Sequence, residues 1–164
     1  MTTTPVAPPP RHDRTFLVVV DESPELQVAI RYAGRRAKAT GGRVVLLYVQ
    51  EPVEFQHWSG VSEIMRDEKR QEAEATLQRL SEQVNLISGQ IPVVQLREGS
   101  RSEEVVKLLN EDKTISILVL AAGTGPEGPG PIITYLTGKG AGKVKVPITI
   151  VPGDLTEEQV DAVT

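Results

Sequence analysis

The chain of 164 residues has room for one domain with a full hydrophobic core and short tails. Its formal net charge of -4 argues against a nucleic-acid surface, and no apolar run approaches the roughly 20 residues that a membrane-spanning helix needs. The absence of cysteine excludes disulfides, thiolate metal sites and cysteine nucleophiles, and it fits a reducing compartment. We therefore expect a soluble, cytoplasmic protein that binds neither nucleic acid nor membrane.

The N-terminal part of the chain predicts an unstructured arm followed by a buried strand and a helix. Residues 1–13 (MTTTPVAPPPRHD) are rich in proline and have almost nothing to bury, which predicts a disordered arm. Residues 15–20 (TFLVVV) are apolar and mostly β-branched, as is typical of a central strand covered on both faces. Asp21 ends this strand. Ser23 at the N-cap and Pro24 as the first helical residue predict the start of the helix.

The next segment predicts a second strand, a loop and a long helix. The strand comprises residues 44–49 (VVLLYV) and completes a right-handed βαβ unit. In the loop, His57 and Trp58 either line a pocket at the strand ends or have a surface or packing role. They have no partner at metal or catalytic spacing, which favours the surface or packing role. The helix is expected over residues 61–84, with a polar first half that projects beyond the sheet or lies along its rim. Its second half carries an apolar stripe of Ala73, Leu77, Leu80 and Val84.

The remaining elements are three strands, two helices and a tail. Residues 91–96 (IPVVQL) predict a third strand, which Pro92 places at a sheet edge. After a helix, the fourth strand is expected at residues 115–120 and the fifth at residues 146–151 (VPITIV), with a glycine-rich loop and a fourth helix between them. Residues 153–164 form an acidic C-terminal tail that is either one short surface helix or without regular structure.

This alternation of strands and helices predicts an α/β domain over residues 14–152, a single open five-stranded parallel sheet with helices on both faces and strand order 3-2-1-4-5. In such sheets, ligands bind beyond the carboxyl ends of the strands. Asp21, residues 49–52 and the loop of residues 123–131 (GTGPEGPGP) each follow a different strand at that edge. A glycine-rich loop before a helix suits phosphate, because backbone N–H groups can approach the ligand closely. The three segments together predict a small-molecule site.

At this point the sequence resembles the universal stress protein family, which has the adenine nucleotide α-hydrolase-like fold. The resemblance covers residues 14–151 and rests on VVVDES at residues 18–23, on LLYVQEP at residues 46–52 and on VPITIV near the C-terminus. It implies a stress-response domain of that fold, with adenine nucleotide bound at the rim where the strands end.

The resemblance also extends to a glycine motif. Nucleotide-binding members of the family carry G-x-x-G, then nine residues, then G-[ST]. Gly125 and Gly128, followed after nine residues by Gly138, match this spacing, while Lys139 stands at the hydroxyl position. The resemblance therefore implies that the three glycines let the backbone approach the phosphates of the ligand, with Lys139 beside them.

The implied ligand is ATP or AMP, and Mg²⁺ would accompany ATP. By the resemblance, Asp21 would contact the adenosine part and Val49 would flank the adenine. The residues alone leave open a helix-capping or loop role for Asp21 and a core role for Val49 at the end of its strand.

Departures in the glycine-rich loop leave a second function open. Pro126, Pro129 and Pro131 lack the N–H groups that cradle phosphate, and Glu127 places a carboxylate where phosphate charge would lie. Lys139 can pair with a phosphate as a point charge but supplies no hydroxyl. The alternative to nucleotide binding is a dimeric interaction or scaffold module, with a proline-stiffened and degenerate phosphate loop.

Catalysis has little support in the sequence. Neither His lies near a Ser with an orienting carboxylate, so no catalytic and no metal-ligating residue is assigned. An enzyme is therefore not expected, beyond slow ATP hydrolysis at most.

A homodimer is expected through the last strand, which runs between Val146 and Val151. This strand is apolar and should lie at a sheet edge, where unpaired backbone groups are a liability. Members of the family pair this edge across a two-fold axis, and Pro147 limits the hydrogen-bonded register without forbidding it. No protein partner other than a second copy is identified.

Overall fold

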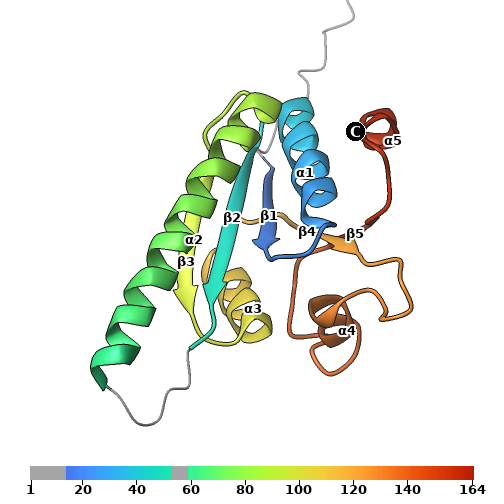
Figure 1. The fold of residues 1–164 in the computed structure, drawn as a ribbon. Helices are drawn as coiled ribbons and strands as arrows, with labels where there is room; N and C mark the ends of the chain where they lie inside the picture. The colour runs from blue at the N-terminus through green and yellow to red at the C-terminus, as the bar shows by residue number, and fades with distance from the viewer. Residues whose placement is uncertain (1–13, 53–58) are drawn as a thin grey trace, which may run out of the picture.

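The computed structural model describes residues 14–52 and 59–164, with the side chains of residues 59–62 excepted. Within these ranges, five strands alternate with five helices (Figure 1). The strands are β1 (Thr15–Val20), β2 (Arg43–Gln50), β3 (Val93–Glu98), β4 (Ile117–Ala122) and β5 (Ile148–Pro152). The helices are α1 (Leu26–Thr40), α2 (Ser59–Ser88), α3 (Arg101–Glu111), α4 (Pro131–Thr137) and α5 (Glu157–Val163). The disorder expected for residues 1–13 and the roles considered for His57 and Trp58 lie outside the described residues.

The strands form one parallel sheet in the order β3-β2-β1-β4-β5, as the sequence predicts. Thr15 of β1 pairs in register with Arg43 of β2, and Phe16 pairs with Ile117 of β4. Because every neighbouring pair is parallel, the carboxyl ends of all five strands lie at the same edge of the sheet.

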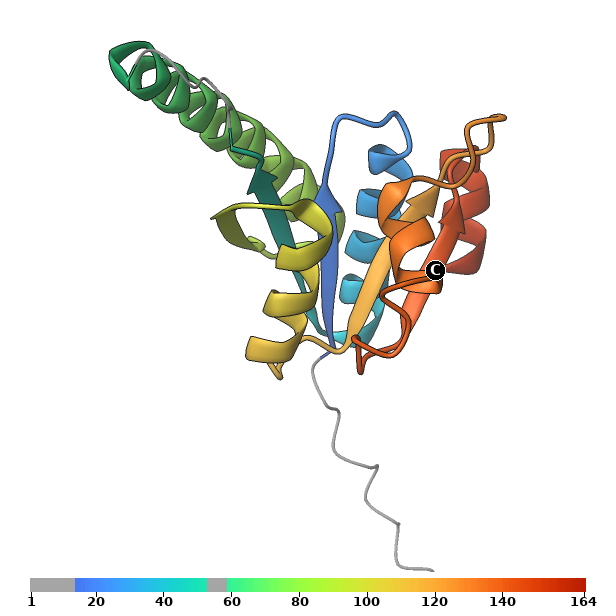
Figure 2. The same cartoon turned by 90° about the horizontal axis from the view of Figure 1, so that it is seen from below.

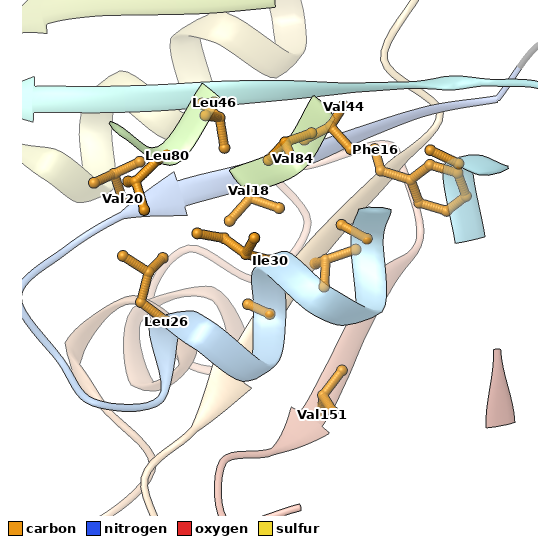
Figure 3. Packing of buried hydrophobic residues seen from close by; sticks show 14 of the residues in the cluster. Phe16, Val18, Val20, Leu26, Ile30, Val44, Leu46, Leu80, Val84 and Val151 are labelled. Carbon is orange, nitrogen blue, oxygen red and sulfur yellow. The ribbon is translucent and has the colours of Figure 1, made fainter. Parts of the chain in front are cut away.

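Helices cover both faces of the sheet, so β1 is buried along its whole length. Helices α1 and α2 pack on one face, where Figure 3 shows Ile30, Leu80 and Val84 against side chains of β1 and β2. Helices α3 and α4 pack on the other face through a second apolar cluster. From β1, these two clusters receive alternate residues: Phe16, Val18 and Val20 in the first, and Leu17 and Val19 in the second.

Strands β3, β4 and β5 each begin two residues later than the sequence predicts. Pro92 immediately precedes β3, and Pro147 immediately precedes β5. Proline has no N–H to donate to a ladder. Before β4, the hydroxyl of Ser116 accepts a hydrogen bond from the N–H of Thr15 at 3.1 Å, in place of a regular ladder bond. The edge position predicted for β3 is confirmed.

Helix α1 begins at Leu26, so the predicted start with Ser23 as N-cap and Pro24 as first helical residue is wrong. The N–H and the hydroxyl of Ser23 both donate to Oδ1 of Asp21, at 2.9 and 2.6 Å. Asp21 thus forms a local turn that competes with capping for the Ser23 side chain. Glu25 occupies the N-cap position instead, without a side-chain capping bond. As a result, one oxygen of the Asp21 carboxylate is held at the end of β1.

Helix α2 is longer at both ends than predicted, and its predicted apolar stripe is buried. Its first half extends well past the sheet (Figure 2), which is the first of the two alternatives that its polar composition left open. There, Arg66 forms an ion pair with Glu98 of β3 at 3.4 Å. None of the helices in the described residues combines the length and the apolar character that crossing a bilayer requires.

The C-terminal residues form a helix, the first of the two alternatives that the sequence leaves open. Val160 of α5 is 1% exposed, and α5 packs on α1. The guanidinium of Arg31 donates to both carboxylate oxygens of Asp161, at 2.7 and 2.8 Å. These hydrogen bonds, more than the charges of Arg31 and Arg35, lower the pKa of the Asp161 carboxyl from its ordinary value. The tail is therefore anchored to the domain by a bidentate ion pair.

Candidate functional site

A cavity of about 880 Å³ opens at the carboxyl end of the sheet. Its walls come from the turn between β1 and α1, the loop between β4 and α4, the exposed side of α4 and the first residues after α4. The volume lies within the range of roughly 300–1,000 Å³ that small-molecule sites occupy.

Five of the six predicted binding residues line this cavity: Asp21, Gly125, Gly128, Gly138 and Lys139. Asp21 follows β1, two of the glycines belong to the β4–α4 loop, and the last two residues follow α4. Strands β1 and β4 are neighbours in the sheet, which brings these distant segments together. The predicted meeting of the β1 end with the glycine-rich loop is thus observed.

The sixth predicted residue, Val49, lies elsewhere. Its side chain is 2% exposed and belongs to the apolar cluster under α3 and α4. It borders a separate cavity of about 170 Å³, together with Glu22 and Arg101 among others. The core role that the residues alone left open is the one observed for its side chain.

Acidic groups outnumber basic ones around the main cavity. Asp21, Glu25 and Glu127 contribute carboxylates to the lining, whereas Lys139 is its one basic residue among the described parts of the chain. Sequence reasoning did not identify Glu25, although its place in the turn after β1 was a usable signal. This lining disfavours a ligand with many negative charges.

The β4–α4 loop uses part of its own backbone hydrogen-bonding capacity. Gly128 donates its N–H to the carbonyl of Gly125 at 3.2 Å, and Gly123 donates to the carbonyl of Pro129 at 3.0 Å. Together with the three prolines, these two glycines leave five of the nine residues 123–131 without a free N–H. Gly128 has φ of 90°, a conformation that favours glycine, so the turn depends on this residue.

Helix α4 and the segment after it complete the wall. Thr134 and Tyr135 line the cavity, and sequence reasoning missed both. Their position one helical turn after the glycine-rich loop was a signal that could have identified them. A Cβ on Gly138 would lie 3.0 Å from the carbonyl oxygen of Thr134, which explains why a glycine suits this position. Lys143 donates to the Tyr135 hydroxyl at 3.1 Å. Its charge is therefore directed at Tyr135.

The chemistry of the lining is that of a binding site. Carboxylate oxygens can accept hydrogen bonds from ligand hydroxyls, the glycines leave backbone exposed, and Lys139 can pair with a phosphate. Among the described residues, no three His, Cys, Asp or Glu side chains are grouped to hold a metal ion. We therefore assign no residue as a ligand of Mg²⁺.

Comparison with known proteins identifies a family match over most of the chain. The model of the universal stress protein family matches residues 13–152. The sequence matches no curated protein.

Solved structures of the same family share the fold. The universal stress protein UspA from Lactobacillus plantarum aligns with a TM-score of 0.70 at 18% identity, over 87% of this chain and 99% of that one. A universal stress protein in complex with cAMP aligns at 0.61 and 18% identity, over 87% and 99% of the two chains. One from Archaeoglobus fulgidus in complex with dAMP aligns at 0.56 and 15% identity, over 85% and 98%. At these identities the likeness establishes the fold alone.

Proposed function

Because this chain belongs to the universal stress protein family, we propose that it binds an adenine nucleotide in the cavity at the carboxyl ends of β1 and β4. The observation that carries the proposal is the convergence of Asp21, Gly125, Gly128, Gly138 and Lys139 on that one cavity. The two structural neighbours in complex with cAMP and dAMP support it by analogy. The proposal places the protein in the stress response and in the cytoplasm, and it assigns no catalytic residue.

The lining favours a nucleotide with one phosphate over ATP. One oxygen of Asp21 is engaged with Ser23, which leaves the other to accept a hydrogen bond from the nucleoside. Lys139 pairs with the phosphate, while Glu127 and the other carboxylates repel additional negative charge. ATP would need Mg²⁺ to offset this repulsion.

Calorimetric titration of the nucleotide-free protein with AMP, cAMP and ATP, each with and without Mg²⁺, tests the proposal. One saturating site per chain is expected, tighter for AMP than for ATP in the absence of Mg²⁺. If none of the nucleotides binds under any of these conditions, the proposed function is wrong.

Glu127→Gln is expected to raise the affinity for Mg²⁺-free ATP by about twofold to fivefold at low salt, because it removes an exposed like charge beside the phosphates. The gain for AMP should be smaller, since AMP carries less charge. Titration of both nucleotides into the variant measures the two effects. Glu82→Gln on α2, which removes an exposed carboxylate outside the cavity, is the matched control. An equal gain in Glu82→Gln would show that only net charge matters.

A second candidate function is a dimeric scaffold that binds no nucleotide. The observation that favours it is the shortage of free N–H groups in residues 123–131, where prolines and internal hydrogen bonds remove donors from the phosphate loop. No binding of any nucleotide, together with a stable dimer in solution, would select this function.

The proposed homodimer forms through β5, which pairs only with β4 in the described part of the chain. Ile150 on this edge strand is 43% exposed. Ile150→Asp is therefore expected to convert the dimer to a monomer, which sedimentation velocity at micromolar concentration measures. Val94→Asp, at a residue 47% exposed on the opposite edge strand β3, is the control and should remain dimeric. A monomeric wild type would contradict the proposal.

A further inference from the structure

The side chain of Arg101 has a buried nitrogen without a partner. Among the described residues, its Nε is the one buried side-chain nitrogen or oxygen that makes no hydrogen bond. Buried polar groups in folded proteins are nearly always paired, because an unpaired charged donor away from water is costly. The unused donor therefore indicates that something other than the described residues completes this position.

Arg101 lies at the same edge of the sheet as the proposed nucleotide site. It is the first residue of α3, which follows the carboxyl end of β3. It lines a cavity of about 50 Å³ that Asp21 also lines, and it lines the cavity of about 170 Å³ that Val49 borders. Arg101 therefore shares one cavity with Asp21 and another with Val49, the two residues that the family resemblance places at the adenosine end of the ligand.

A structural ion pair does not account for Arg101. Glu22, Glu51 and Glu72 line the cavity at Val49 together with it, but no carboxylate in the described residues lies within 4.0 Å of its guanidinium. The nearby Arg97 behaves differently, since it forms ion pairs with two glutamates of α3.

We propose that Arg101 is a further binding residue that recognises the nucleoside end of the ligand. Its Nε–H, which has no partner among the described residues, donates a hydrogen bond to an acceptor nitrogen of the purine base. The inference rests on the proposed function, because it extends the proposed site from the main cavity, which Arg101 does not line, into the cavity of about 50 Å³ that also has Asp21 in its wall. In this proposal Arg101 recognises the base, and the side chain of Val49 is not needed for that recognition.

The test compares adenosine with AMP. Arg101→Lys keeps the charge but loses the guanidinium, and Arg101→Ala loses both. Each variant is expected to weaken the binding of adenosine and of AMP by the same factor, roughly tenfold or more. Ligand-observed NMR titration measures weak adenosine binding, and calorimetry measures AMP. Arg79→Ala, at an exposed arginine on α2, is the matched control and should bind both ligands like the wild type.

The outcomes separate this inference from the proposed function. A wild type that binds neither ligand defeats the proposed function, and the inference with it. A wild type that binds both, with unchanged dissociation constants in the two Arg101 variants, overturns the inference alone. A loss confined to AMP would place Arg101 at the phosphate and would also overturn it. Thermal denaturation verifies that each variant is folded, and Arg101→Lys carries the test if Arg101→Ala does not fold.

Discussion

Asp21→Asn is expected to weaken AMP binding by roughly tenfold to a hundredfold, the range for hydrogen bonds to charged groups. Oδ1 of Asp21 accepts both hydrogen bonds from Ser23, and the amide oxygen of asparagine can accept them equally. The other carboxylate oxygen becomes an NH₂ group, which cannot accept a hydrogen bond from a nucleoside hydroxyl. Asparagine therefore preserves the turn while it removes the proposed contact, and calorimetric titration with AMP measures the loss.

The chain provides a matched control for this substitution. Asp112 forms the same turn, in which its Oδ1 accepts from the N–H and hydroxyl of Thr114 at 3.0 and 2.6 Å. It lies between α3 and β4, before the amino-terminal end of β4, whereas the cavity lies at the carboxyl ends of the strands. Asp112→Asn should therefore bind AMP like the wild type. An unchanged affinity in Asp21→Asn, or equal losses in the two variants, would remove Asp21 from the binding site.

Leu80→Ala is expected to destabilise the fold by about 2–5 kcal/mol, the usual cost of removing a buried leucine and leaving a cavity. Leu80 is fully buried where α2 packs on the sheet, near Val20 and Leu46 (Figure 3). Chemical denaturation, with the free energy of unfolding taken from the transition midpoint and slope, measures the effect.

Leu86 on the same helix is the matched control, because its side chain is 88% exposed. Leu86→Ala should change the free energy of unfolding by less than about 0.5 kcal/mol. Similar losses in the two variants would mean that the face of α2 that packs on the sheet is wrongly assigned.

Much of the fold could be predicted from local patterns in the sequence. The unbroken apolar run of residues 15–20 indicated a strand buried on both faces, and every residue of β1 is buried. Alternating strands and helices indicated a parallel sheet. The predicted strand order 3-2-1-4-5 is also the order observed. The strand boundaries were less predictable, because the first ladder bond depends on partners such as Ser116 that are distant in sequence.

The site was predicted in outline, since the topology alone brings the β1 end and the β4–α4 loop to one edge. Its side-chain detail was not, because hydrogen bonds and packing decide it. Ser23 was expected to cap α1, but Asp21 binds its hydroxyl. Glu25 and Arg101 also line cavities at this edge. The place of Glu25 in the turn after β1 was a usable signal, whereas Arg101 belongs to no motif that a sequence pattern would single out. Arg101 was recognisable only through its buried and unpaired Nε.

A titration of nucleotide-free, ¹⁵N-labelled protein with AMP, followed by NMR chemical shifts, tests the central claim most directly. The account predicts saturable binding of one AMP per chain, with the largest shift changes at the amides of Asp21, Gly125, Gly128, Gly138 and Lys139. No saturable change up to millimolar AMP, or changes confined to residues away from this cavity, would contradict it.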